Sequence, residues 1–284
     1  MAIKIYYPVS RKLSKAISRV RECLLYNLPS EVELSCNPRR ADIQFIDFIG
    51  QHYEDPSYLE IFDVPPYPIM RKYIIVNHCP PPPRLLNKDY RWLFHNALAI
   101  ISYIPPSCEY QCFGNIDWDM LKDRYILTPW GVDHRKFIRM NIPRDIDLVY
   151  TGLVAETEAH NEIEKACSEL NARCFHAKGD LSDFELVYIL NRARYVSAMR
   201  HHIGFELIGL EGAFCGSVPL YLDYPIYRLW FNNIGVFINP RNIVEDLKRI
   251  LKQDPKPIPL EKLEMFKCEN ISRKVWEKIL EFIQ

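Results

Sequence analysis

The clearest fold signal lies in YVSAMRHHIGFELIGLEGAFCGSVPLYL, residues 195–222. Residues 195–199 predict a strand, residues 205–214 predict a helix that Gly216 ends, and residues 218–222 predict the next strand. A strand, a helix and a strand in this order form a parallel pair with a helix on one face of the sheet. Ligands of such sheets bind beyond the carboxyl ends of the strands, so the loop after the first strand is a candidate binding site.

The same alternation of strands and helices continues outward from this stretch. Ser182 and Glu185 fit a capping box, which predicts a helix start between them. Further strands are expected at residues 3–9, 32–35, 43–49, 73–77, 99–104, 125–128 and 146–151. Further helices are expected at residues 13–24, 161–170, 183–193 and 239–252. The pattern predicts parallel sheets covered by helices on both faces.

The length of the chain predicts two domains, because 284 residues exceed one ordinary core. We expect a first domain at residues 1–138 and a second at residues 139–284, with a cleft between them. The helix after residue 271 is a candidate to pack back on the first domain.

Composition excludes some classes of protein. The 36 Lys and Arg residues balance 36 Asp and Glu residues, which argues against nucleic acid as the main partner. No run of 18 apolar residues predicts a membrane span, and the first residues do not resemble a signal peptide. Nine irregularly spaced cysteines suit reduced core thiols better than a disulfide framework. We therefore expect a cytoplasmic protein.

Four segments in register resemble the retaining GT-B glycosyltransferases. They are TPWGVD at residues 128–133, VYTG at 149–152, GFELIGLEGAFCGSVP at 204–219 and the strand and helix from residue 235 to 252. The resemblance implies two Rossmann-like domains and a nucleotide-sugar donor, with no cofactor. We expect donor binding without a bound metal, because the sequence contains no convincing carboxylate cluster. The resemblance also implies that the first domain faces an acceptor, which could be a glycan, a lipid or a protein.

The segment from residue 204 suits a donor site on physical grounds as well. Gly204 lets a ligand approach the backbone closely, and a helix that begins near Phe205 directs free N–H groups at a diphosphate. Glu211 lies in an otherwise apolar helix and needs a partner there. By resemblance Glu211 holds the nucleotide ribose; the alternative is a surface-facing or salt-bridged glutamate.

Two departures from the family weaken this site. Ile203 stands where the family carries its first glutamate, and Leu153 and Glu158 replace the usual arginine and lysine of the phosphate clamp. Glu206 is a candidate catalytic substitute for the missing glutamate, although a first-turn glutamate is an equal explanation. Arg200, with His201 and His202, lies in the loop before Gly204, where a cation could reach phosphates; the alternative is a solvated loop.

Other candidates follow from the resemblance. His78 ends a buried strand and is expected to touch the sugar or the acceptor, or else to bond a loop. Gly152 opens the nucleotide domain, and Lys178 lies beside the base or in an ordinary turn. Trp130, Gly131 and Asp133 belong to the hinge at the cleft.

Four alternative interpretations remain. The chain could be a non-catalytic GT-B-like module that binds a sugar, a nucleotide or a protein, or another Rossmann-like enzyme, although no Gly-x-Gly-x-x-Gly follows the first strand. Asp117-Trp118-Asp119 could hold a metal as in GT-A enzymes, but its place at a helix start favours capping. The basic helix near residues 11–25 could rest on an anionic membrane, although a solvated face is commoner.

Overall fold

A computed structural model of the chain describes residues 2–7, 15–48, 72–78, 91–106, 118–152, 159–179, 181–201 and 204–283. The chain divides into two compact units. The first contains residues 1–130 and 268–284, and the second contains residues 131–267. No helix among the described residues has the length and apolar character needed to cross a membrane.

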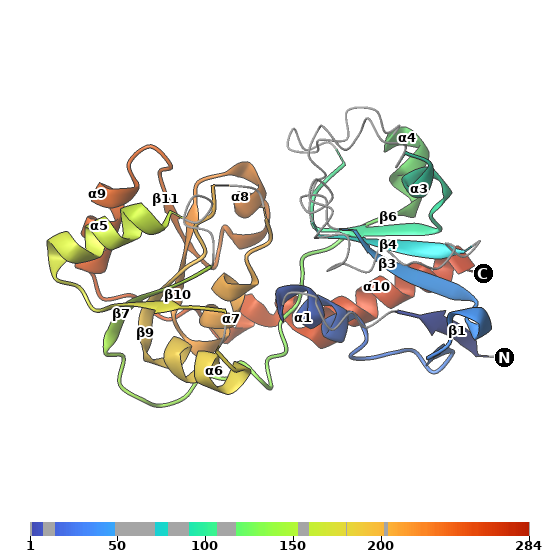
Figure 1. Ribbon diagram of the computed structural model, residues 1–284, viewed down its shortest axis with the longest axis horizontal. Helices are drawn as coiled ribbons and strands as arrows, with labels where there is room; N and C mark the ends of the chain where they lie inside the picture. The colour runs from blue at the N-terminus through green and yellow to red at the C-terminus, as the bar shows by residue number, and fades with distance from the viewer. Residues whose placement is uncertain are drawn as a thin grey trace. The chain divides into compact units, whose positions relative to one another are not determined.

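Unit 1 is built on a six-stranded parallel sheet with the strand order β2-β1-β3-β4-β5-β6. Its strands are β1 (Ile3–Tyr6), β2 (Val32–Leu34), β3 (Ile43–Phe48), β4 (Tyr73–Asn77), β5 (Ala99–Ser102) and β6 (Tyr125–Leu127). Its helices are α1 (Lys15–Leu24), α3 (Arg91–Asn96), α4 (Trp118–Leu121) and α10 (Cys268–Ile283). Figure 1 shows α3 and α4 on one face of this sheet and α1 and α10 on the other.

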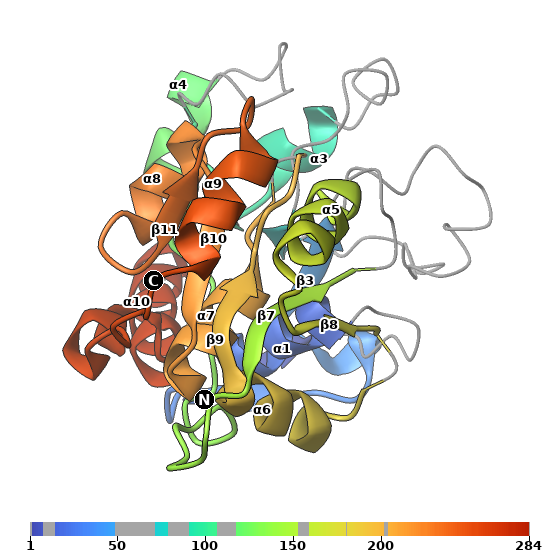
Figure 2. The same cartoon turned by 90° about the vertical axis from the view of Figure 1, so that its left-hand side faces the viewer.

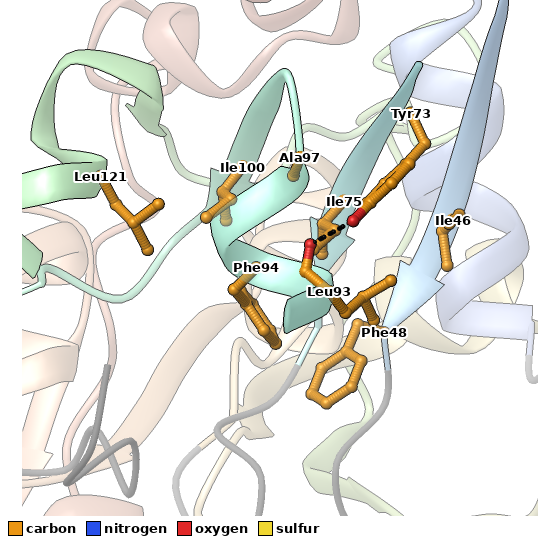
Figure 3. Packing of buried hydrophobic residues seen from close by; sticks show 9 residues of the cluster. All are labelled: Ile46, Phe48, Tyr73, Ile75, Leu93, Phe94, Ala97, Ile100 and Leu121. Atoms are coloured by element: carbon orange, nitrogen blue, oxygen red, sulfur yellow. Dashed lines mark hydrogen bonds between the residues drawn. The ribbon is translucent and has the colours of Figure 1, made fainter. Parts of the chain in front are cut away.

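Alternate residues of the central strands form the two halves of the unit 1 core, because successive side chains in a strand point to opposite faces. Ile46 and Phe48 of β3 lie in a cluster with Leu93 and Phe94 of α3 (Figure 3). The Tyr73 hydroxyl donates to the carbonyl oxygen of Leu93 at 2.6 Å and satisfies the polar end of a buried ring. The intervening residues of β3 therefore belong to the face that α1 and α10 cover.

The two ends of the chain meet on that second face. The Trp276 indole of α10 donates from Nε1 to the carbonyl oxygen of Leu24 at 2.8 Å, and its ring lies 5.6 Å from that of Phe45. Ile17 and Val20, on the apolar face of α1, are buried. The apolar face of α1 is therefore used inside the unit and is not available for a membrane contact.

Unit 2 carries a five-stranded parallel sheet in the order β11-β10-β9-β7-β8. Its strands are β7 (Ile146–Thr151), β8 (Cys174–Ala177), β9 (Ala193–Ser197), β10 (Val218–Leu222) and β11 (Val236–Ile238). Its helices are α5 (His160–Leu170), α6 (Asp183–Arg192), α7 (Leu207–Cys215), α8 (Pro225–Phe231) and α9 (Ile243–Leu251). Helices α5 and α9 lie side by side on one face, and α6 and α7 lie on the other (Figures 1 and 2).

Local signals placed several elements as expected. The capping box of Ser182 and Glu185 is formed in both directions, and Gly216 ends α7 with a left-handed φ of 90°. Strand β9, expected at residues 195–199, ends two residues earlier because the Ser197 hydroxyl accepts the N–H of Met199 at 3.3 Å.

Two helix starts were predicted too early. Helix α9 begins at Ile243 rather than at Pro240, because the Asn239 side chain accepts the Arg241 N–H at 3.0 Å and forms a turn first. Helix α7 begins at Leu207, so Phe205 precedes it and Glu206 is its N-cap residue. Glu206 therefore holds the N-cap position instead of lying in the first helical turn, which was one of the two explanations for this residue.

The boundary between the units lies at residue 130, whereas the sequence suggested residue 138. Val132 donates its N–H to the carbonyl oxygen of Phe266 at 2.8 Å, and it forms a parallel bridge with Lys267. These two segments therefore enter and leave unit 2 side by side. Helix α10 follows directly and belongs to unit 1.

The expectation of reduced core thiols is wrong for four cysteines. Cys23 of α1 and Cys268 of α10 form a disulfide, as do Cys167 and Cys174. The first pair is 245 residues apart in sequence, so only the packing of α1 on α10 brings it together. Spacing along the chain could not have indicated it.

Candidate functional site

The loops after the strands of unit 2 carry most of the candidate donor-binding residues. Gly152 follows β7, Lys178 follows β8, and Arg200 and His201 follow β9. Because all five strands are parallel, these loops emerge at one edge of the sheet. Helix α7 starts at the same edge, since it connects β9 back to β10.

An ion pair occupies the start of α7. Arg200 Nε lies 3.2 Å from Glu206 Oε1, with the two side chains 36% and 12% exposed. Glu206 directs its carboxylate to Arg200, and its side chain makes no capping bond to α7. A Cβ on Gly204 would lie 2.6 Å from Glu206 Oε1, so a side chain at residue 204 would displace the carboxylate. The structure therefore brings Arg200, Gly204 and Glu206 together.

Two tyrosines that the sequence analysis missed lie near this pair. The hydroxyls of Tyr221 in β10 and Tyr227 in α8 are buried and have no hydrogen-bond partner in the described part of the chain. Burial, and then the negative charge of Glu206, raise the pKa of both hydroxyls well above the usual range. Both phenols are therefore protonated and able to donate. Unmet buried donors are costly and mark a place where a ligand or a rearrangement could supply an acceptor.

Aromatic rings pack around the Tyr221 side chain. Tyr221 stacks on Phe231 at 4.4 Å, and the ring of Phe205 lies 5.0 Å from that of Phe231. Phe205 therefore packs with these rings beside the start of α7.

Glu211 lies in the middle of α7 and is 1% exposed. The surface-facing alternative is therefore wrong. Glu211 also affects Cys215, which lies in the same helix. Burial of the thiol, and then the negative charge of Glu211, raise the pKa of Cys215 to about 12. Burying a carboxylate in an apolar helix costs free energy unless neighbouring groups compensate its charge.

Gly152 is fixed by two histidines that the sequence did not single out. Its φ of 116° is left-handed, which favours glycine. His176 bonds through Nε2 to the Gly152 carbonyl oxygen at 2.9 Å, and His160 does the same to the Thr151 carbonyl oxygen at 3.0 Å. The two imidazoles pack edge to face, 4.9 Å apart. They hold the backbone where β7 ends.

The remaining cations at this edge have different environments. Lys178 is exposed. His201 lies 3.8 Å from Glu162, measured from Nε2 to Oε1. Of the cations predicted here, Arg200 is the one placed beside the start of α7. Leu153, Glu158, His202 and Ile203, which mark the departures from the family, lie outside the described residues.

In unit 1, His78 lies at the carboxyl edge of the sheet, directly after β4. Its Nε2 is 2.6 Å from Asp47 Oδ1, and the same oxygen accepts the Tyr7 hydroxyl at 2.7 Å. Asp47 and Tyr7 were not predicted. A signal for Asp47 was present, because it is the only acidic residue in the apolar strand IQFIDF.

The hinge candidates have structural contacts. Trp130 is buried, with its ring 5.4 Å from that of His78 and 5.8 Å from that of Tyr103. The Asp133 side chain accepts the Arg135 N–H at 3.1 Å, which forms a local turn. Gly131, between them, is buried and begins unit 2.

No group of three or more His, Cys, Asp or Glu side chains within the described ranges could hold a metal ion. Asp119 of the Asp-Trp-Asp motif is exposed at the start of α4, and Asp117 lies outside the described residues. The placement of Asp119 is that expected of a helix-start aspartate.

The chain is similar to known proteins in structure and not in sequence. No family model matches the chain, and no curated protein matches it by sequence. Solved structures match over nearly the full chain. HepE of Anabaena, solved in complex with UDP and glucose, has 8% identity and a TM-score of 0.69, and the match covers 98% of this chain and 100% of that one.

Two further structures agree with this match. AviGT4, a glycosyltransferase involved in avilamycin A biosynthesis, has 10% identity and a TM-score of 0.65, covering 99% of this chain and 98% of its own. Sucrose-phosphate synthase from Thermosynechococcus elongatus has 10% identity and a TM-score of 0.63, covering 100% and 99%. Identities this low establish the fold alone. Together with the two parallel sheets, they show that this chain has the GT-B fold of two Rossmann-like units.

Proposed function

We propose that the chain is a glycosyltransferase that moves a sugar from a nucleotide-sugar donor to an acceptor glycan, lipid or protein. The observation that carries this proposal is the placement of Arg200 and Gly204 beside the N-terminus of α7, at the carboxyl edge of β9. A cation and the free N–H groups of a helix N-terminus together suit a diphosphate. The similarity in fold to HepE, which was solved with UDP and glucose, supports the same class of donor.

The roles within the site follow from this placement. Arg200 binds the diphosphate and stabilises it as it departs, which requires Arg200 to release Glu206. Glu211 holds the ribose, and Lys178 lies beside the base. Glu206 and His78 contact the transferred sugar or the acceptor. The resemblance to retaining enzymes favours retention at the anomeric carbon without a bound metal.

The decisive experiment compares a nucleoside with its diphosphate. Arg200→Ala should lower the affinity for UDP at least about tenfold and leave the affinity for uridine nearly unchanged, because a charge-assisted contact contributes roughly 1.5–3 kcal/mol. The partial exposure of Arg200 places the effect at the lower end. Glu211→Ala should weaken both ligands alike. Arg249→Ala, which removes a surface arginine paired with Asp246 on α9, is the matched control.

Calorimetry with UDP, uridine and a panel of other nucleotides measures these affinities, and melting temperatures report folding. Equal loss of nucleoside and diphosphate in Arg200→Ala would contradict the phosphate role. Affinity should survive a chelator; its loss with chelator and return with manganese would contradict metal independence. NMR of the anomeric proton in the product tests retention.

A second candidate function is a non-catalytic module with the same fold. The Arg200–Glu206 ion pair favours it, because the cation already has an anionic partner. Binding of a nucleotide-sugar with no transfer or hydrolysis across the donor panel would support this alternative over the enzyme.

A peripheral membrane contact remains a prediction. Because the apolar face of α1 is buried, the contact would use basic residues alone. Sedimentation with vesicles that contain phosphatidylserine, compared with neutral vesicles, tests it.

A further inference from the structure

A buried carboxylate joins three strand ends of unit 1. Tyr7 follows β1, Asp47 lies near the end of β3, and His78 follows β4, and these three strands are neighbours in the sheet. Asp47 Oδ1 is 2.7 Å from the Tyr7 hydroxyl and 2.6 Å from His78 Nε2. Tyr7 is 4% exposed, His78 is 7% exposed, and the Asp47 side chain is 10% exposed. The three side chains therefore form one connected, nearly buried chain of hydrogen bonds.

The charge of Asp47 decides which nitrogen of His78 carries the proton. An ionised carboxylate accepts hydrogen bonds and donates none. Nε2 must therefore be the protonated nitrogen, and in the neutral ring Nδ1 is left with a lone pair. The Tyr7 hydroxyl likewise donates to Asp47. Burial first, and then the charge of Asp47, raise the pKa of Tyr7 well above its usual range, so this donor keeps its proton.

Packing holds the imidazole in this orientation. The His78 backbone N–H donates to the carbonyl oxygen of Phe48 at 3.0 Å, and the indole of Trp130 lies 5.4 Å from the imidazole ring. Tyr7 is itself fixed, because its ring stacks on Phe45 at 5.1 Å. A flip of the His78 ring would break the bond to Asp47. The tautomer and the orientation are thus determined together.

We propose that Asp47 and Tyr7 are positioning residues, which fix His78 so that Nδ1 accepts a hydrogen bond from a hydroxyl group of the glycosyl substrate. The inference rests on the proposed function for the nature of the ligand, and on unit 1 alone for the tautomer. Polyhydroxylated ligands are recognised by side chains with a defined acceptor, and a histidine of fixed tautomer supplies one. The Asp47 carboxylate does not touch the substrate; it acts through His78.

The first test reads the tautomer directly, without substrate. Two-dimensional NMR of the ¹⁵N-labelled histidine side chains, with His78 assigned from the His78→Gln spectrum, should show the Nε2–H form. Asp47→Asn keeps the shape but can offer an NH₂ donor to Nε2, so the Nε2–H form should be lost. Tyr7→Phe should leave it in place. Tyr73→Phe, which removes another buried tyrosine bond of unit 1, is the matched control and should leave it unchanged.

The second test measures turnover of the nucleotide-sugar that the donor panel identifies. Asp47→Asn should lower kcat about ten- to a hundredfold with less than a threefold change in KM, because small errors in position affect the transition state most. Tyr7→Phe should lower kcat by only a few fold. A purely structural role would lower the melting temperature in both variants without changing the tautomer.

An Nδ1–H form in the native protein, or an Asp47→Asn variant with unchanged tautomer and kcat, would overturn the positioning role even in an active enzyme. The absence of any turnover or nucleotide-sugar binding would refute the proposed function and the hydroxyl partner of Nδ1. In that case the tautomer and its dependence on Asp47 would still be measurable. The two failures are therefore distinguishable.

Discussion

Among the described residues, Asp47 and Glu206 are nearly buried carboxylates at the carboxyl edges of the two sheets, but the two are used differently. In unit 1, Asp47 accepts from both Tyr7 and His78, so the donors around it are satisfied. In unit 2, Glu206 pairs with Arg200, and the nearby hydroxyls of Tyr221 and Tyr227 have no hydrogen-bond partner in the described part of the chain.

The donors around Asp47 in unit 1 all have an acceptor, whereas the two tyrosine hydroxyls in unit 2 lack one in the described part of the chain. A satisfied network orients its members and gains nothing from rearrangement, which suits a residue that must be held in one tautomer. Buried hydroxyls without acceptors raise the free energy of the native state. A ligand that draws Arg200 away would free the Glu206 carboxylate for such donors.

Removing the two carboxylates should affect stability unequally. Asp47→Ala leaves two buried donors unmet and should lower the free energy of unfolding by roughly 3 kcal/mol, since each unmet group costs about 1–3 kcal/mol. Glu206→Ala leaves an arginine that water can reach, so the loss should stay below about 1 kcal/mol. Urea denaturation measures both values. Similar losses would show that the two edges are energetically alike.

Adding a methyl group at Gly209 tests how closely Tyr221 packs on α7. A Cβ there would overlap the Tyr221 hydroxyl and would lie 2.8 Å from Cζ of the same ring. Overpacking outweighs the better helix propensity of alanine, so Gly209→Ala should destabilise by about 1–2 kcal/mol. Because the nearest atom is the hydroxyl oxygen, Tyr221→Phe in the same chain should recover part of the loss. Additive effects of the two substitutions would argue against this packing.

Removing single hydroxyls should give opposite signs at the two edges. Tyr7→Phe deletes a bond to a charged acceptor and should destabilise by about 1 kcal/mol or somewhat more. Tyr221→Phe and Tyr227→Phe remove donors that make no bond within the described part of the chain, so stability should stay the same or rise slightly. Thermal and chemical denaturation of the three variants provide the comparison. A clear loss in either unit 2 variant would show that its hydroxyl has an acceptor in solution.

The smallest effect concerns the thiol beside Glu211. A pKa of Cys215 raised from 9.0 to about 12 favours the native state below pH 9, and this contribution is lost as the pH rises through the native value. Relative to Cys215→Ala, the free energy of unfolding of the native protein should therefore fall by less than about 1 kcal/mol between pH 8 and pH 9.5. In the native protein Cys215 should also resist iodoacetamide, while the exposed Cys36 reacts. Rapid labelling of Cys215, mapped by mass spectrometry, would contradict its burial.

Much of the fold was predictable because its signals are local. The apolar runs placed β4, β7 and β10, the Ser182–Glu185 box placed the start of α6, and Gly216 placed the end of α7. Element ends were less predictable where a side chain bonds its own backbone, as Ser197 and Asn239 do. A side chain that bonds the backbone two residues away competes with the hydrogen bonds of a helix or strand. Composition does not reveal which of these bonds forms.

The pattern of residues is enough to predict the alternation of strands and helices, and with it two parallel sheets whose carboxyl edges carry His78, Arg200 and Gly204. The folded chain was needed to show that Asp47 joins Tyr7 to His78 across 31 to 40 residues, and that Cys23 meets Cys268. Hydrophobic periodicity is set within a few residues of the chain, so a sequence displays it. The partner of a buried polar group is set by how strands are ordered in the sheet, and that order is a property of the folded chain as a whole.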